Sequence, residues 1–170
     1  METLMPSVSS VEEVMAAFAA LNKPGVPSFF HLTARLPSAG RTDTPVAATP
    51  NMSVMLKCYA EGGENTLHAH VNEDHVFLVL QGAADFYGPK DELKTVRTGQ
   101  GVMLPRGTHY RFTARQEQPL VLIRIGCKTA PDADVHARVD ISGKPVAGDS
   151  KENKQVDTVF SDAWFGKALA

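Results

Sequence analysis

The chain has 170 residues, of which 43% are hydrophobic and 21% charged, and its formal net charge is −2. Such a chain is long enough for one globular domain with a well-filled core. Its Lys and Arg residues are dispersed, which argues against nucleic acid as a partner, because phosphate binding needs clustered positive charge.

The ends of the chain and its cysteines indicate the compartment. The first ten residues, METLMPSVSS, lack the basic and apolar regions of a signal peptide. No apolar run approaches the ~20 residues that span a bilayer. Cys58 and Cys127 both lie in apolar, strand-like runs. We therefore expect a cytoplasmic protein with no membrane partner and two buried, reduced thiols, with a disulfide as the alternative.

The first expected element is a helix over residues 10–22. Ser10 and Glu13 have the spacing of a capping box. Apolar residues recur at helical spacing as Val11, Val14, Met15, Phe18 and Leu21. The following stretch, residues 37–50, is rich in Pro, Ala, Thr and Gly, and is predicted to be a loop.

From Met52 onward the pattern changes to short apolar runs separated by Gly or Pro. The predicted strands are residues 52–61, 76–82, 83–88, 93–99, 101–105, 109–114 and 119–127. This spacing is typical of an antiparallel sandwich or barrel. Residues 129–156 are polar and are expected to form a surface extension. Residues 159–170 contain Trp164 and are expected to dock on the barrel or on a second subunit.

Three of the six histidines lie within eight positions, in the stretch HAHVNEDH. His68 and His70 are two residues apart, so on a strand both imidazoles point to one face. His75 follows a short polar turn, at the head of the next apolar strand. A strand, a turn and a returning strand bring the three rings together, and imidazoles suit Zn, Cu, Fe and Ni. Three protein ligands with open positions indicate a catalytic rather than a structural metal site.

The spacing around these histidines resembles the first motif of the cupin superfamily, which is Gly, five residues, H-x-H, three or four residues, Glu, six residues, Gly. Here Gly62, His68, His70 and Gly82 match, and His75 occupies the Glu position. An alternative register makes Asp74 the carboxylate but loses the final Gly. In the preferred register, Glu73 and Asp74 are turn residues at the rim, or alternatively partners that orient a ligand imidazole.

The second cupin motif is matched in its Gly and Pro positions. Gly99 is followed after five residues by Pro105-Arg106-Gly107, but Tyr110 occupies the usual His position and His109 lies one place early. Strand alternation turns Tyr110 inward and His109 outward, whereas a one-residue bulge would exchange them. Both residues therefore stay candidates for the fourth position at the metal.

The resemblance implies an all-β fold: a single cupin jelly-roll β-barrel with an N-terminal helix and a C-terminal extension. The implied organisation is an N-terminal helix and arm over residues 1–50, the barrel over 51–128, and an extension over 129–170 that packs on the barrel or on a partner subunit. It also implies a divalent metal inside the mouth of the barrel. The candidate metal ligands are His68, His70, His75 and His109.

Replacing the cupin Glu with His75 leaves three neutral imidazoles, so the metal keeps its full charge and no carboxylate serves as a base. This favours a non-haem Fe(II) dioxygenase-type oxidoreductase acting on a small organic molecule, as the resemblance allows. The alternatives are a non-oxidative isomerase, lyase or hydrolase using Zn, Mn or Ni, and a binding module without turnover. Tyr110 and Arg124, which interrupts an apolar strand, are the candidate catalytic residues. His136 is expected to be exposed, and the exposed edges of a small barrel favour a homodimer.

Overall fold

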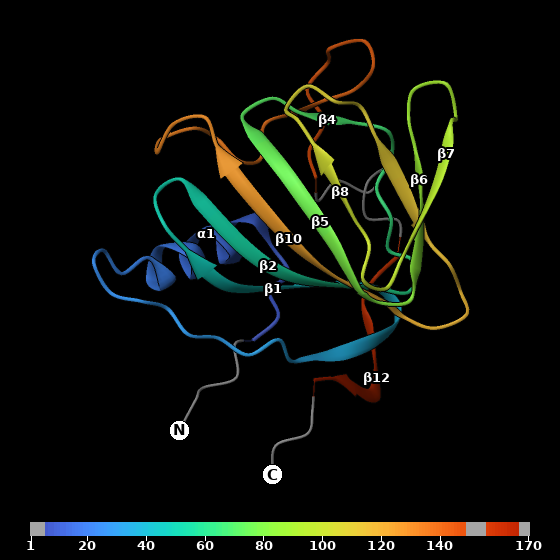
Figure 1. Cartoon of the computed structure of the whole chain (residues 1–170), viewed down its shortest axis with the longest axis horizontal. Helices are drawn as coiled ribbons and strands as arrows, with labels where there is room; N and C mark the ends of the chain where they lie inside the picture. Colours follow the sequence, from blue (N-terminus) through green and yellow to red (C-terminus); the bar gives the residue numbers. More distant parts are fainter. Residues whose placement is uncertain (1–5, 149–155, 167–170) are drawn as a thin grey trace.

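The described residues, 6–148 and 156–166 of a computed structural model, contain one helix, α1 (Val11–Leu21). The Glu13 N–H donates to the Ser10 hydroxyl, and the Glu13 carboxylate accepts from the Ser10 N–H, which confirms the predicted capping box. Asn22 ends the helix. α1 packs against the first strand, behind the main sheet (Figure 1).

The rest of the described structure is built from strands. They are β1 (Ala34–Ala48), β2 (Met52–Tyr59), β3 (Glu61–Gly62), β4 (Ala69–His70), β5 (Glu73–Gln81), β6 (Ala83–Tyr87), β7 (Leu93–Arg97), β8 (Gly101–Leu104), β9 (Arg111–Ala114), β10 (Leu120–Lys128), β11 (Arg138–Val139) and β12 (Val159–Phe165). The largest sheet has the order β12-β1-β2-β10-β5-β8, with β3 beside β1. A second sheet has the order β7-β6-β9, and β4 pairs with β11. The all-β prediction and the N-terminal helix are confirmed.

The long strand β1 corrects the prediction of a loop over residues 37–50. β1 pairs with β12 at its start and with β2 at its end, and its neighbours in the fold override a composition that is poor for strands. Its two prolines both lie where the register shifts: Pro37 against β12 and Pro45 against β2. A proline, which lacks an N–H, is tolerated at such irregularities.

The core divides into two clusters because the side chains of the main sheet alternate between its faces. On β2, Tyr59 belongs to the cluster that the main sheet shares with β6 and β9, whereas Cys58 belongs to a cluster with β1 and β10. Aromatic rings dominate the first cluster, where Phe86 and Phe112 lie 5.0 Å apart by their centroids. Both clusters are nearly free of solvent, and the histidines lie at one end of the first.

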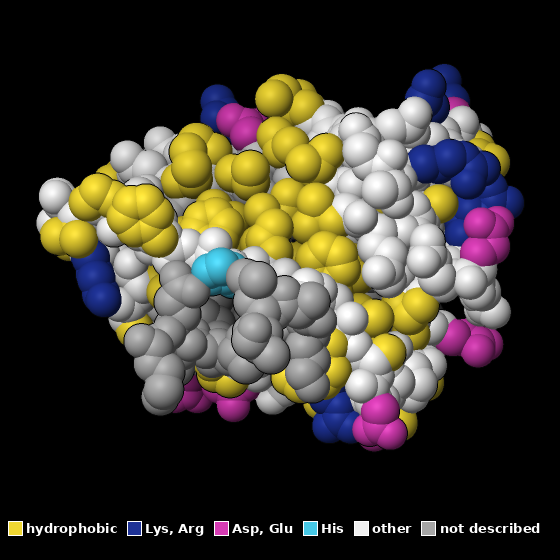
Figure 2. Space-filling view, turned by 60° about the horizontal axis from the view of Figure 1, so that its bottom comes forward, with side chains coloured by type: hydrophobic (Ala, Val, Ile, Leu, Met, Phe, Trp, Pro, Cys, Tyr) yellow, Lys and Arg dark blue, Asp and Glu magenta, His cyan; other side chains and the backbone are white. Residues whose placement is uncertain are grey.

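The C-terminal segment of the described chain forms β12, which lies along the first half of β1 (Figure 1). Residues 149–155 and 167–170 of the predicted extension lie outside the described residues. Figure 2 shows apolar side chains gathered on the face that is lowest in Figure 1. Exposed apolar side chains of the segment before β1 and of β12 include Phe29, Phe160 and Trp164. The homodimer expected from the sequence stays a prediction.

Both cysteines are free, as expected, but only Cys58 is buried, and the expectation of a buried Cys127 is wrong. Cys127 alternates to the outer face near the end of β10, where the strand is no longer covered. No helix in the described part of the chain has the length and apolar character needed to cross a membrane.

Candidate metal centre

Strand β5 delivers two of the candidate ligands by simple alternation. Glu73, His75, Phe77 and Val79 are all buried on one face, and the residues between them point the other way. The prediction that Glu73 is a rim turn residue is therefore wrong, because the strand begins at Glu73 itself and the turn is confined to residues 71–72. The apolar alternation of β5, carried back two positions, is the sequence signal that would have found Glu73.

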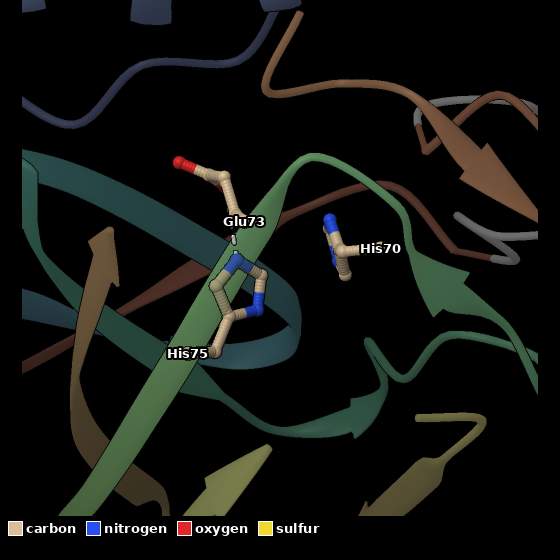
Figure 3. A group of neighbouring side chains, drawn as sticks. All are labelled: His70, Glu73 and His75. Carbon is tan, nitrogen blue, oxygen red and sulfur yellow. Dashed lines mark hydrogen bonds and ion pairs between the residues drawn. The ribbon is translucent and has the colours of Figure 1, made fainter. Parts of the chain in front are cut away.

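His70 approaches these side chains from β4, across the turn (Figure 3). Its ring centroid lies 4.2 Å from that of His75. One donor atom each from His70, Glu73 and His75 lie within 4.8 Å of one another, and all three residues are buried. Two imidazoles and a carboxylate at this separation could hold a metal ion. We call these three residues the His-Glu-His cluster.

Arg124, on the neighbouring strand β10, holds the carboxylate of the cluster. It forms an ion pair with Glu73, and its Nη2 also lies 2.7 Å from His75 Nε2. His75 Nε2 lies 2.9 Å from Glu73 Oε2 (Figure 3). His75 Nε2 thus contacts both a carboxylate oxygen, which only accepts, and a guanidinium nitrogen, which only donates, so Glu73 and Arg124 together fix the orientation of the His75 ring. The alternative in which Glu73 orients a ligand imidazole fits this geometry.

His68 and Tyr110 lie beside the cluster as direct partners across a β-bridge. The His68 N–H donates to the Tyr110 carbonyl at 3.1 Å, and the Tyr110 N–H donates back at 2.9 Å. Their side chains share a face, with ring centroids 4.9 Å apart. His109 points away, and its Nε2 donates to the Asp140 carbonyl at 3.0 Å. The structure thus brings Tyr110 to the cluster but does not bring His109 there, because alternation holds and no bulge intervenes.

Burial keeps the imidazoles neutral. Desolvation, with Arg138 and Arg41 adding to it, lowers the pKa of His68 to about 4. Desolvation and Arg124 likewise lower the pKa of His75 to about 4, against the opposing effect of Glu73. Desolvation, His75 and Arg138 lower the pKa of His70. Neutral imidazole is the form that binds a metal, so these rings need to lose no proton at neutral pH.

Glu73 and Tyr110 respond to burial in opposite ways. Burial alone would raise the pKa of Glu73, but Arg124 and His75 outweigh it and hold that pKa below its usual value. Burial raises the pKa of Tyr110 to about 12. The site therefore holds an ionised carboxylate and a protonated phenol. The expectation that no carboxylate lies at the site is wrong, although Arg124 balances the charge of Glu73.

Three buried donor atoms around the cluster have no hydrogen-bond partner among the described residues. They are His68 Nε2, His70 Nδ1 and Glu73 Oε1. On His68, Nδ1 donates to the Thr66 carbonyl at 2.7 Å, so the orphaned Nε2 carries a lone pair. Unsatisfied buried polar atoms are rare and costly, and a metal ion held by the His-Glu-His cluster would give its members a partner. The residues present fit a divalent ion bound by imidazole and carboxylate.

Sequence reasoning missed a second arginine near the cluster. Arg138, on β11, lies opposite His70 in the β11–β4 ladder. No local pattern marks it, because the polar segment that carries it reaches the site only through the fold.

Comparison with known proteins places this geometry in a family. Residues 55–126 match the model of the Cupin domain. The matched residues are a cupin domain. The matched stretch contains nearly all of strands β2 to β10. It also contains Tyr110, Arg124 and every residue of the His-Glu-His cluster. The predicted cupin jelly-roll is confirmed. None of the curated proteins compared with the chain matches it.

Solved structures with the same fold include an uncharacterized conserved protein with a double-stranded β-helix domain from Klebsiella pneumoniae, at 15% identity and a TM-score of 0.51, covering 57% of this chain and 80% of that one. TT1209 from Thermus thermophilus is 20% identical, with a TM-score of 0.50 and coverage of 56% and 90%. KdgF from Halomonas sp. is 24% identical, with a TM-score of 0.49 and coverage of 55% and 84%. At 15% and 20% identity, the likeness to the first two structures extends to the fold alone.

Proposed function

We propose that this chain is a metal-dependent cupin enzyme of the non-haem Fe(II) dioxygenase type, acting on a small organic molecule. The observation that carries the proposal is the His-Glu-His cluster, with its buried and unpartnered donor atoms. Two histidines and one carboxylate with open positions are the donor set of non-haem Fe(II) oxygenases. An Fe(II) ion bound there would supply the redox chemistry that no side chain offers.

The chain's own residues orient and isolate the reaction. Tyr110 keeps its proton at neutral pH, and in this proposal it donates a hydrogen bond to a substrate oxygen beside the cluster. Arg124 neutralises Glu73 and also lines an adjoining cavity. The aromatic cluster beneath the histidines, including Phe77, excludes water from that side.

The test is metal analysis followed by oxygen consumption. Protein reconstituted with Fe(II) is offered diketones, phenols and enolisable acids, and O₂ uptake is followed with an electrode. We expect about one equivalent of Fe(II) per chain, lost on changing His70→Ala. His109→Ala is the matched control, because His109 lies outside the cluster and bonds to the backbone. Iron content unaffected by His70→Ala would remove the basis of the proposal.

One observation favours a second candidate, a non-oxidative isomerase or lyase. Glu73 places an ionised carboxylate in the cluster, and such a group can act as a general base. This candidate predicts turnover under strict exclusion of oxygen with Zn or Mn in place of iron. Turnover that requires both O₂ and iron would reject it.

A further inference from the structure

A cavity of about 190 Å³ is connected to the His-Glu-His cluster through Arg124, although none of the three cluster residues lines it. Residues 7–11 and the inner side of α1 cover it, held down by the bridge in which the Val8 N–H donates to the Asp43 carbonyl at 2.7 Å. The opposite wall is the inner face of β1, β2 and β10. Arg124 belongs to this wall and also touches Glu73 and His75, so one side chain joins the cavity to the cluster.

Positive charge is in excess around the cavity. Four cationic side chains line it: Arg41, Lys57, Arg124 and Arg138. Lys57 pairs with Asp43, and Arg124 pairs with Glu73. Among the described residues, Arg41 donates to two neutral groups, the Asn65 side chain and the Gly148 carbonyl. Arg41 and Arg138 thus form no ion pair with any described residue.

Arg138 is the least satisfied of these groups. Its Nε and Nη1 are buried and have no hydrogen-bond partner in the described part of the chain. His136, two residues earlier and also lining the cavity, has a buried Nε2 to which no described residue hydrogen-bonds. The expectation that His136 is simply exposed is therefore wrong. A buried guanidinium without a counter-charge is costly, so its place at a cavity wall indicates an anionic ligand.

We propose that this cavity binds the carboxylate of a small organic acid, and that Arg138 is the residue that recognises it. The inference rests on the proposed function, because it names the substrate class of that same site. The planar fork of a guanidinium matches a carboxylate with two parallel hydrogen bonds. The cavity is smaller than the ~300–1,000 Å³ of pockets for drug-sized ligands, which favours an acid of few atoms. Two arginines that form no ion pair within residues 6–148 and 156–166 suit a dicarboxylate.

The test is calorimetric titration of the full chain with malonate, in a buffer free of phosphate and of other carboxylates. Malonamide, which is nearly isosteric and uncharged, and inorganic phosphate are titrated in parallel. We expect malonate to bind and malonamide not to bind. Arg138→Gln should lower the affinity for malonate at least tenfold. Arg115→Gln is the matched control, since Arg115 pairs with Asp85 and neither residue lines the cavity.

A second variant keeps the test valid if Arg138→Gln fails to fold. A Cβ added at Gly148 would lie 1.5 Å from Arg138 Nη1, so Gly148→Ala displaces the guanidinium without removing it. Gly148→Ala should also lower the affinity for malonate. Unchanged malonate affinity in either folded variant, or equal binding of malonamide, overturns the inference. Binding of phosphate but not malonate overturns the assignment to carboxylates.

Metal content, measured on the same samples, separates the two proposals. Malonate binding that depends on Arg138 in a chain that takes up no metal would refute the proposed function and leave the inference standing. Stoichiometric metal with no malonate binding would refute the inference alone.

Discussion

At the scale of single residues, the decisive contact is the buried pair of Glu73 and Arg124. The side chain of Glu73 is 1% exposed and that of Arg124 is 11% exposed. Strand alternation predicts the inward direction of both, but their pairing depends on β5 and β10 being neighbours. Arg124 was therefore predictable as a charge within an apolar strand. Glu73 was instead predicted to lie in a turn, because the residues Asn, Glu and Asp at positions 72–74 are typical of turns.

Changing Glu73→Gln should destabilise the fold by about 3–5 kcal/mol, because it leaves Arg124 buried without its counter-charge. Urea denaturation measures the free energy of unfolding. The matched control is Asp74→Asn on the adjacent residue, whose half-exposed ion pair with Arg106 is worth at most about 1 kcal/mol. Equal effects of the two changes would mean that the buried pair does not form.

Metal-free protein should lose stability as the pH falls from about 6.5 to about 4. The pKa values of His68 and His75 are both lowered to about 4 by burial, so the unfolded chain binds more protons in this window than the folded one. Above this pH window, each histidine contributes about 3 kcal/mol to the free energy of unfolding. This contribution is lost at the lower end of the window. The contribution of Glu73, whose pKa is also lowered, is lost as the pH falls further.

Denaturation with urea at several pH values, in the presence of a chelator, measures this dependence. The pKa of His70 is lowered too, so His70 adds to the same dependence, and His68→Asn, which removes one titrating group, should make the curve less steep. A curve of the same steepness in that variant would contradict the assignment.

At the scale of elements, the strands that depend on local pattern were predictable, whereas the long strand β1, which depends on its partners, was not. β5 to β10 follow the apolar runs of the sequence to within a few residues. β1 has two prolines and no apolar run, and it exists because β2 and β12 pair with its two halves. α1 was predictable because a capping box is a local signal that the tertiary fold leaves intact.

The cap of α1 gives a prediction at this scale. Ser10→Ala should destabilise the protein by about 1 kcal/mol, because the Glu13 N–H loses its acceptor. Ser10→Gly is the matched variant and should cost only a few tenths of that, since glycine is itself a tolerated cap. Thermal unfolding of the two variants measures the difference. Ser10→Ala as stable as the wild type would show that the helix end contributes nothing to the fold.

At the scale of the whole molecule, the sheet has open edges at β12 and β8, and apolar side chains gather on the face shown in Figure 2. We expect the chain to form a homodimer, since exposed edges of small barrels need cover. Light scattering after size-exclusion chromatography should give twice the chain mass of 18.3 kDa. A single species at the chain mass across a range of concentrations would contradict this.

The position of Arg124 between the cluster and the cavity has a thermodynamic consequence. A cation that draws Glu73 to itself releases Arg124, and an anion in the cavity that draws Arg124 to itself releases Glu73. The two binding events are then linked through one shared contact. Linkage is reciprocal, so the factor by which a bound anion raises the affinity for the metal equals the factor by which the bound metal raises the affinity for the anion.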